Sequence, residues 1–113
     1  MNEPDQVVLV LTTIGADADA VAFARTLVEE RLAACVNVLP PMTSVYRWKE
    51  TVEEGREQQL VIKTTSGRAA ALEARLRELH VYELPEFLVL AGRAGEAYRD
   101  WVSDCTRPRK EIL

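Results

Sequence analysis

Hydrophobic residues along the chain follow two different periods, and these periods divide it into strands and helices. Residues 6–13 contain an uninterrupted aliphatic run, Val7 to Leu11, bounded by Gly15. A run without alternation is typical of a strand that is buried on both faces. Residues 57–65 alternate instead, which predicts a strand with Leu60, Ile62 and Thr64 on one face and Val61 and Lys63 on the other. A short buried strand is expected at 87–91.

Three segments carry hydrophobic residues at three- and four-residue spacing, as amphipathic helices do. They cover residues 16–33, 67–79 and 95–105. Asp17 or Asp19 is available as the N-cap of the first helix, and Ser66 as that of the second. The expected inner faces are Val21, Ala24, Leu27, Val28 and Leu32 in the first helix, Leu72, Leu76 and Leu79 in the second, and Tyr98, Trp101, Val102 and Cys105 in the third.

The segment Cys35 to Trp48 is extended, but Pro40-Pro41 cannot donate hydrogen bonds within a sheet and so predicts a bend. The polar residues 50–55 are expected to form the turn of a hairpin. The order is therefore strand, helix, strand, strand, helix, strand, with an added C-terminal helix. It predicts a ferredoxin-like α+β fold (βαββαβ), an antiparallel sheet covered on one face by helices. We expect a single domain over residues 1–113.

The predicted hairpin is long for a chain of this size, since typical strands have about 5–6 residues. Its outer half carries Met42, Val45, Tyr46 and Trp48. One small domain offers too little core to cover these side chains, and an exposed apolar hairpin invites pairing with other chains. We therefore expect another subunit to cover the hairpin.

Composition excludes several classes of protein. The net charge of −4 gives no positive surface for nucleic acid or for anionic membranes. No apolar run approaches the roughly 20 residues that span a bilayer. Cys35 and Cys105 are too few for a disulfide framework, and the acidic segment Met1 to Asp5 lacks the basic flank of a signal peptide. We expect a cytoplasmic protein with no nucleic-acid or membrane partner.

His80 is the only histidine, and it lies between a predicted helix and a predicted strand. It is a candidate metal ligand or proton acceptor. The alternative is a histidine at a helix C-terminus that interacts with the last carbonyls. Cys35 is a candidate thiolate ligand for Cu(I) or Zn, and the alternative is a small buried hydrophobic residue. Because the two residues lie far apart in sequence, a shared metal site has to be assembled by the fold or across subunits.

Three stretches of this chain resemble the CutA family, the divalent-cation-tolerance proteins. The first is Glu78 to Glu86, which is similar to a family loop where a histidine is followed by Pro-Tyr-Glu and then Pro-Glu. The second runs from Arg31 through Asn37 to Tyr46-Arg47-Trp48-Lys49, and the third comprises Glu57 and Leu60 to Thr65. In family order the matches extend from about Val7 to Val102, nearly the whole chain.

The resemblance implies a homotrimer in which the long hairpins pack edge to edge around a threefold axis, and an association with copper and other divalent cations. Four positions depart from the family pattern. Thr12 and Thr13 stand where a thiol would favour soft-metal binding, Leu79 precedes His80 in place of a second histidine, and Val81 replaces the proline that usually follows it. The residues at positions 12, 13 and 79 predict weak metal binding, whereas the loss of the proline at Val81 makes the loop freer.

A second candidate site is a ligand cleft between subunits, expected to combine aromatic surface with charged side chains. Trp48 and Tyr46 offer flat apolar surface, Lys63 a positive charge, and the glutamates hydrogen-bond acceptors. The predicted members are Trp48, Glu57, Lys63, Tyr82, Glu83 and Glu86. The alternative is an interface ion-pair network that only holds the oligomer together. Because the second helix separates Lys63 from the loop of Tyr82, we expect their contact to be made between neighbouring subunits.

The sequence thus favours a non-enzymatic trimer that responds to divalent metal ions such as copper. The alternative is a PII-like signalling trimer that binds a small metabolite, although no glycine-rich phosphate loop is present. An RNA-binding protein is disfavoured by the acidic charge, and an acylphosphatase by the absence of an arginine in Thr12-Thr13-Ile14-Gly15. No Ser-His-Asp or Cys-His pairing is readable, so an enzyme is not predicted.

Overall fold

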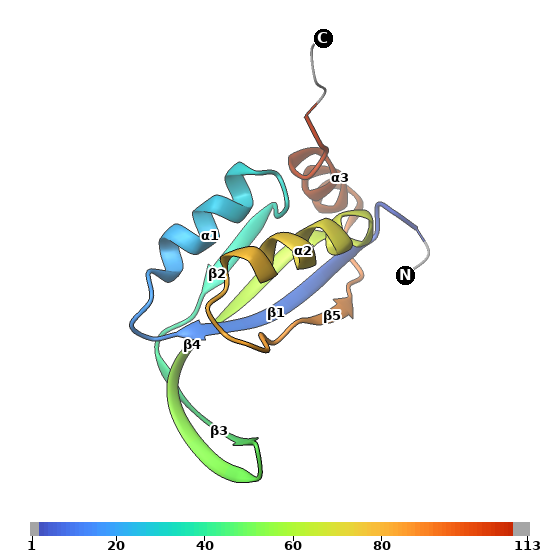
Figure 1. The fold of residues 1–113 in the computed structure, drawn as a ribbon. Coiled ribbons are helices and arrows are strands. Elements are labelled where there is room, and N and C mark those ends of the chain that lie inside the picture. Colours follow the sequence, from blue (N-terminus) through green and yellow to red (C-terminus); the bar gives the residue numbers. More distant parts are fainter. Residues whose placement is uncertain (1–2, 110–113) are drawn as a thin grey trace.

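The computed structural model describes residues 3–109, so the first two and last four residues of the expected domain, with part of the segment Met1 to Asp5, lie outside the described range. A five-stranded sheet carries three α-helices and one short 3-10 helix (Figure 1). The elements are β1 (Val7–Gly15), α1 (Ala20–Glu29), β2 (Cys35–Val38), β3 (Met42–Trp48), β4 (Thr51–Thr65), η1 (Ser66–Arg68), α2 (Ala69–Leu79), β5 (Leu88–Ala91) and α3 (Glu96–Cys105).

The sheet has the strand order β2-β4-β1-β5, and β3 pairs with the outer half of β4. All pairings are antiparallel. If β2 and β3 are taken as one broken strand, this is the ferredoxin-like order, and the α+β fold class predicted from the sequence is confirmed. The break lies at Pro40-Pro41, where the prolines interrupt the ladder as expected.

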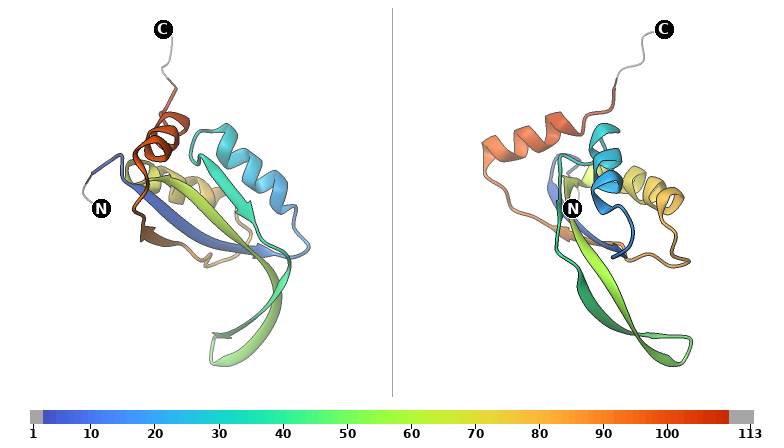
Figure 2. Two further views of the ribbon diagram at one scale, coloured as in Figure 1. Left: turned by 180° about the vertical axis from the view of Figure 1, so that it is seen from behind. Right: turned by 90° about the vertical axis from the view of Figure 1, so that its left-hand side faces the viewer.

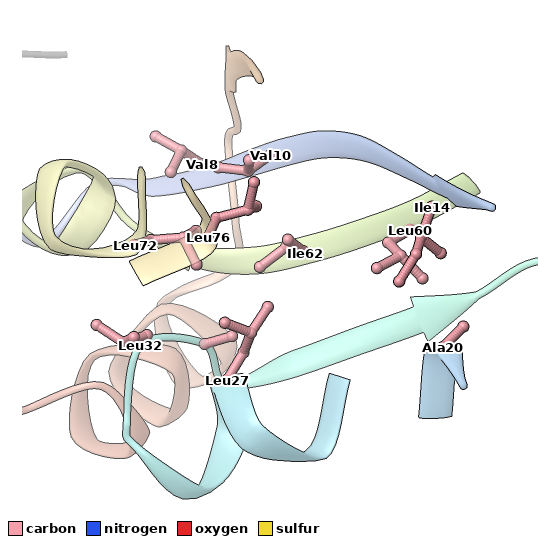
Figure 3. Packing of buried hydrophobic residues seen from close by; sticks show 11 residues of the cluster. Val8, Val10, Ile14, Ala20, Leu27, Leu32, Leu60, Ile62, Leu72 and Leu76 are labelled. Atoms are coloured by element: carbon pink, nitrogen blue, oxygen red, sulfur yellow. The ribbon is translucent and has the colours of Figure 1, made fainter. Parts of the chain in front are cut away.

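The inner face of the sheet is covered by α1 and α2 (Figure 3). Even-numbered residues of β1 and β4 point into this layer because successive strand residues face opposite sides. The fully buried members include Val8, Val10, Leu60 and Ile62 from the sheet, Leu27 from α1, and Leu72 and Leu76 from α2. The expectation that β1 is buried on both faces is wrong in part, because Leu9 and Leu11 of the other face stay partly exposed.

The first helix is shorter than its hydrophobic period suggested. The side chain of Asp19 caps it by accepting a hydrogen bond from the backbone N–H of Ala22 at 3.0 Å. Its buried residues are Ala20, Ala24 and Leu27, whereas Val21 and Val28 are exposed, contrary to expectation. The extra turns predicted after residue 29 are absent because Arg31 adopts a φ of 61°, which ends the helix.

Ser66 does not cap α2, which corrects the sequence prediction. It starts the 3-10 helix η1, and its hydroxyl donates to the backbone carbonyl of Glu3. The N-cap position of α2 is Arg68, which has no side-chain capping bond.

The hairpin turn is also tighter than predicted. β3 and β4 are joined by Lys49 and Glu50 alone, with φ values of 48° and 72°. Residues 51–55, expected in the turn, instead extend β4 to 15 residues. The hairpin therefore projects well beyond the rest of the sheet (Figure 1).

The third helix lies on the other side of the sheet from α1 and α2, at the end where β1 begins (Figure 2). Val102 is its one buried residue and packs with Val7 and Ala34. The guanidinium of Arg31 donates to the backbone carbonyls of Asp104 at 2.6 Å and Arg107 at 2.7 Å, and so ties the helix end to the domain. Within residues 3–109, no helix is both long and apolar enough to cross a bilayer.

Candidate functional site

A pocket lies between the hairpin and the loop that follows α2. Its volume is about 630 Å³, within the range of small-molecule sites. The hairpin contributes side chains from β3 and β4, and residues 82–88 form the opposite wall. The lining residues are Thr13, Tyr46, Trp48, Glu57, Tyr82, Glu83, Leu84, Pro85, Glu86, Phe87 and Leu88.

A hydrogen bond between Tyr82 and Glu57 connects the two walls of this pocket. The Tyr82 hydroxyl donates to a carboxylate oxygen of Glu57 at 2.8 Å. Burial of the phenol, and then its bond to the Glu57 carboxylate, raises the pKa of Tyr82 from 10.0 to about 12. Tyr82 is therefore a neutral hydrogen-bond donor to Glu57 at physiological pH.

His80 positions the pocket loop with both of its ring nitrogens. Nε2 lies 2.6 Å from the carbonyl oxygen of Thr13, and Nδ1 lies 3.1 Å from the backbone nitrogen of Tyr82. A carbonyl only accepts and a backbone N–H only donates, so these partners require the neutral ring with its proton on Nε2. The ring also stacks at a tilt on Tyr82, with centroids 4.6 Å apart. His80 thus fixes the position at which Tyr82 enters the pocket.

Glu86 is held in place by Gln59 of β4. The Gln59 amide donates to the Glu86 carboxylate at 3.0 Å and to the Thr12 carbonyl at 2.7 Å. Glu83 lies beside them in the lining and is exposed. Within the described part of the chain, none of the three lining glutamates forms an ion pair.

Two aromatic residues of the hairpin complete the pocket. Tyr46 and Trp48 alternate along β3 and therefore face the same side. The ammonium group of Lys49 lies over the Trp48 ring, 5.5 Å from its centroid, which is within the range of a cation–π interaction.

The structure places five of the six predicted cleft residues around this pocket: Trp48, Glu57, Tyr82, Glu83 and Glu86. Lys63 is not among them. It pairs with Leu9 on one side and Cys35 on the other, six residues along β4 from Glu57 and thus about 20 Å away. The contact expected for Lys63 between neighbouring subunits stays a prediction.

The two predicted metal ligands do not meet within one chain. Cys35 is half-buried and lies opposite Lys63 of β4. His80 contacts the Thr13 carbonyl, and Thr13 pairs with Gln59 of β4. Lys63 and Gln59 are four residues apart, so about 13 Å along β4 separates the positions of Cys35 and His80. Among residues 3–109 there is no group of three or more His, Cys, Asp or Glu side chains that could hold a metal ion. The residues of one chain therefore do not fit a tight metal centre.

Several pocket residues were not predicted from the sequence. Thr13 is noted in the sequence only because a thiol is absent there, and Leu84, Pro85, Phe87 and Leu88 are predicted only as parts of a loop or strand. Gln59 lies behind the lining and orients Glu86. Their positions in the sequence could have indicated them, because these residues flank the predicted ones along the same loop and strands.

Comparison with known proteins gives a consistent result. Residues 8–105 match the family described as CutA1 divalent ion tolerance protein. The chain is 42% identical over 99 residues to the divalent-cation tolerance protein CutA of Thermus thermophilus, covering 87% of this chain and 96% of that protein. It is 46% identical over 89 residues to a CutA homolog of Xenopus laevis, covering 78% of this chain but only 59% of that protein.

The fold comparison agrees with the sequence matches. The solved structure of the PII-like protein CutA from Nostoc sp. PCC 7120 in apo form superimposes with a TM-score of 0.83 at 35% identity, and the match covers 90% of this chain and 99% of that one. The resemblance drawn from the three sequence stretches is thereby confirmed.

Proposed function

The chain belongs to the CutA1 divalent ion tolerance protein family, and on this basis we propose that it is a non-enzymatic, cytoplasmic homotrimer that takes part in the response to divalent metal ions, copper among them. The family match over residues 8–105 carries the metal-tolerance part of this proposal. The non-enzymatic part is supported by His80, the only imidazole, whose ring nitrogens are both bonded to backbone groups. Neither nitrogen is free to move a proton to or from a substrate.

The outer face of the sheet supports self-association. Leu9 lies beside Leu90, and Leu11 lies between Leu88 and Val61, so β1, β5 and part of β4 place apolar side chains side by side on this face. Leu88 and Leu90 are 53% and 47% exposed. α3 packs on only one end of this face. Burial of each large apolar side chain is worth about 1.5–3 kcal/mol, which favours covering the face with another copy.

The projecting hairpin supports the same assembly. Its exposed side chains include Val45 at 64% and Val52 at 60%. β3 pairs only with β4 and leaves its other edge open. An open apolar edge favours pairing with another strand.

Native mass spectrometry of the protein purified without added metal tests the assembly. We expect three subunits. Val45→Asp should dissociate the trimer or unfold it, because it buries a charge at the contact. Val21→Asp is the matched control, since Val21 is 60% exposed but lies on the solvent side of α1. A folded native monomer, or equal dissociation by both variants, would refute the proposed assembly.

We propose that metal binding is weak. A metal ion at His80 must displace one of its two backbone hydrogen bonds, each worth roughly 1 kcal/mol net. Calorimetry with Cu(II) should give an affinity that falls as the pH is lowered, because a metal ion binds only a deprotonated imidazole nitrogen. His80→Ala should abolish it, whereas Cys105→Ser serves as the control. An unchanged affinity in His80→Ala would place the metal elsewhere.

The second candidate function is PII-like signalling through a small ligand. The pocket of about 630 Å³ between hairpin and loop favours it, because a metal ion alone needs no such volume. Native mass spectrometry separates the candidates, since a co-purified organic ligand supports signalling and a co-purified metal supports metal response.

A further inference from the structure

The pocket between the hairpin and residues 82–88 has a charge that nothing else in it balances. Its lining contains Glu57, Glu83 and Glu86 and no basic side chain. Two of the carboxylates are held by neutral donors, the Tyr82 hydroxyl at 2.8 Å and the Gln59 amide at 3.0 Å. Hydrogen bonds from neutral groups orient a carboxylate without cancelling its charge. The pocket therefore presents a strongly negative potential to any occupant.

The rest of the lining is apolar and aromatic. Tyr46 and Trp48 come from the hairpin, and Tyr82 and Phe87 from the opposite wall. Aromatic faces attract cations through their quadrupole, most strongly in the case of tryptophan. The ammonium of Lys49, the next residue in the chain, lies 5.5 Å from the Trp48 centroid, so a ligand cation competes with Lys49 for this ring or uses its other face.

We propose that this pocket binds a small organic cation, an amine or quaternary ammonium compound with an apolar body. This inference deepens the ligand-binding alternative above and rests on it. The volume of about 630 Å³ suits a molecule rather than a bare metal ion, whose protein ligands must approach to about 2.0–2.6 Å. The glutamates recognise the charge, and the aromatic side chains cover the apolar body. A carboxylate or phosphate compound is excluded by repulsion.

Glu57 and Tyr82 give the pocket a defined shape before ligand binds. Their hydrogen bond joins the two walls, and the two bonds of His80 hold the backbone at Tyr82. A preformed site loses less conformational entropy on binding. Because Leu88 also belongs to the apolar outer face, a neighbouring subunit adds a further wall, and the assembled protein is the one to test.

Benzyltrimethylammonium is a suitable probe, compared with neutral benzyl alcohol and anionic phenylacetate. Binding is followed by the fluorescence of Trp48 in a Trp101→Phe background, because the chain has two tryptophans. We expect the cation to bind at least about tenfold more tightly than benzyl alcohol, equal to about 1.4 kcal/mol. Phenylacetate should not bind. The preference should weaken at high salt.

Charge-removing variants locate the site. Glu83→Gln combined with Glu86→Gln should remove most of the preference for the cation. Trp48→Leu should weaken the binding of both cation and alcohol; because this variant lacks the fluorescent residue, its binding is measured by calorimetry. Glu53→Gln combined with Glu54→Gln is the matched control, since both residues lie on the same hairpin outside the pocket. Circular dichroism and native mass spectrometry verify that each variant keeps its fold and subunit number.

Three outcomes would overturn the proposal: equal binding of cation and alcohol, equal loss in the control variant, or displacement of the cation by Cu(II) or Zn(II) through Glu83 and Glu86. The last would make the pocket a metal site. Failure of this experiment with an intact trimer leaves the proposed metal response standing. A monomer that still prefers the cation would refute the trimer and not the pocket.

Discussion

At the scale of single residues, His80 illustrates how structure changes the reading of a side chain. In the sequence it is a lone imidazole among carboxylates, open to metal binding or proton transfer. In the structure its Nε2–H donates to Thr13 and its Nδ1 accepts from the backbone of Tyr82. The same ring that looks reactive in the sequence is a connector between β1 and the pocket loop.

Thr12 gives a prediction about stability. Its side chain is fully buried, and its hydroxyl has no hydrogen-bond partner among residues 3–109. Thr12→Val keeps the shape and removes the unpaired group, so the free energy of unfolding should rise by about 1 kcal/mol in urea denaturation. Thr64→Val is the control. Thr64 is equally buried but donates to the Leu32 carbonyl at 2.8 Å, so its replacement should lower stability by a similar amount. Equal effects of the two variants would contradict this explanation.

Tyr82 gives a prediction about pH. Its pKa is raised to about 12, so the folded protein holds the phenolic proton more tightly than the unfolded chain. The resulting stabilisation is complete below pH 10.0 and is lost as pH rises through about 12. Tyr82→Phe lacks this group. The stability difference between wild type and Tyr82→Phe should therefore shrink over this range in thermal denaturation, and a constant difference would contradict the prediction.

At the scale of elements, the hairpin forms one of the two walls of the candidate site. β3 supplies Tyr46 and Trp48, and β4 supplies Glu57, whereas the opposite wall comes from the loop before β5. β4 is long enough to serve both the core and the pocket, with Leu60 and Ile62 buried at one end and the turn at the other. The position of the pocket thus depends on the geometry of the hairpin.

The turn of the hairpin offers a test at this scale. Glu50 has a φ of 72°, in the left-handed region that costs a residue with a Cβ roughly 1–2 kcal/mol. Glu50→Gly should raise the thermal midpoint, because glycine adopts this φ without strain. The gain in the free energy of unfolding should be at most about 1 kcal/mol, because glycine also raises the conformational entropy of the unfolded chain. Glu50→Val should lower it, because β-branched residues fit this region worst. If both variants shift the midpoint in the same direction, the turn strain is not the cause.

At the scale of the whole molecule, one chain is more extended than a compact domain. Its radius of gyration is 15.0 Å, compared with about 13 Å expected for this length. The excess comes from the hairpin, which extends past the sheet (Figure 1). Together with the partly exposed apolar outer face, this shape supports the proposed self-association.

The proposed assembly predicts how stability depends on concentration. If the folded chains associate, the unfolding midpoint must rise with protein concentration, because mass action stabilises the bound form. Calorimetric scans over a roughly hundredfold range of protein concentration measure this. Leu90→Lys places a charge on the outer face and should reduce the dependence, whereas a midpoint that is independent of concentration in the wild type would contradict self-association.

The sequence by itself determined the fold class, the family and five of the residues that line the candidate pocket. Period-two and three-to-four-residue hydrophobic patterns reflect which face of each element is buried, so the order of strands and helices followed directly. Five of the six predicted cleft residues line one pocket because they lie on the hairpin and on one loop. Local features with a clear chemical signal, such as the Asp19 cap and the break at Pro40-Pro41, were also predictable.

Only the tertiary structure decided the details that depend on neighbours distant in sequence. The exposure of Val21, the partner of Ser66 and the length of β4 follow from packing and pairing that local preference does not encode. The same holds for Lys63. Its positive charge suggested a place in the cleft, but the strand register holds it about 20 Å from Glu57. Register is a property of paired strands, and hydrogen-bond partners such as those of His80 are a property of the folded chain, so neither can be read from one segment alone.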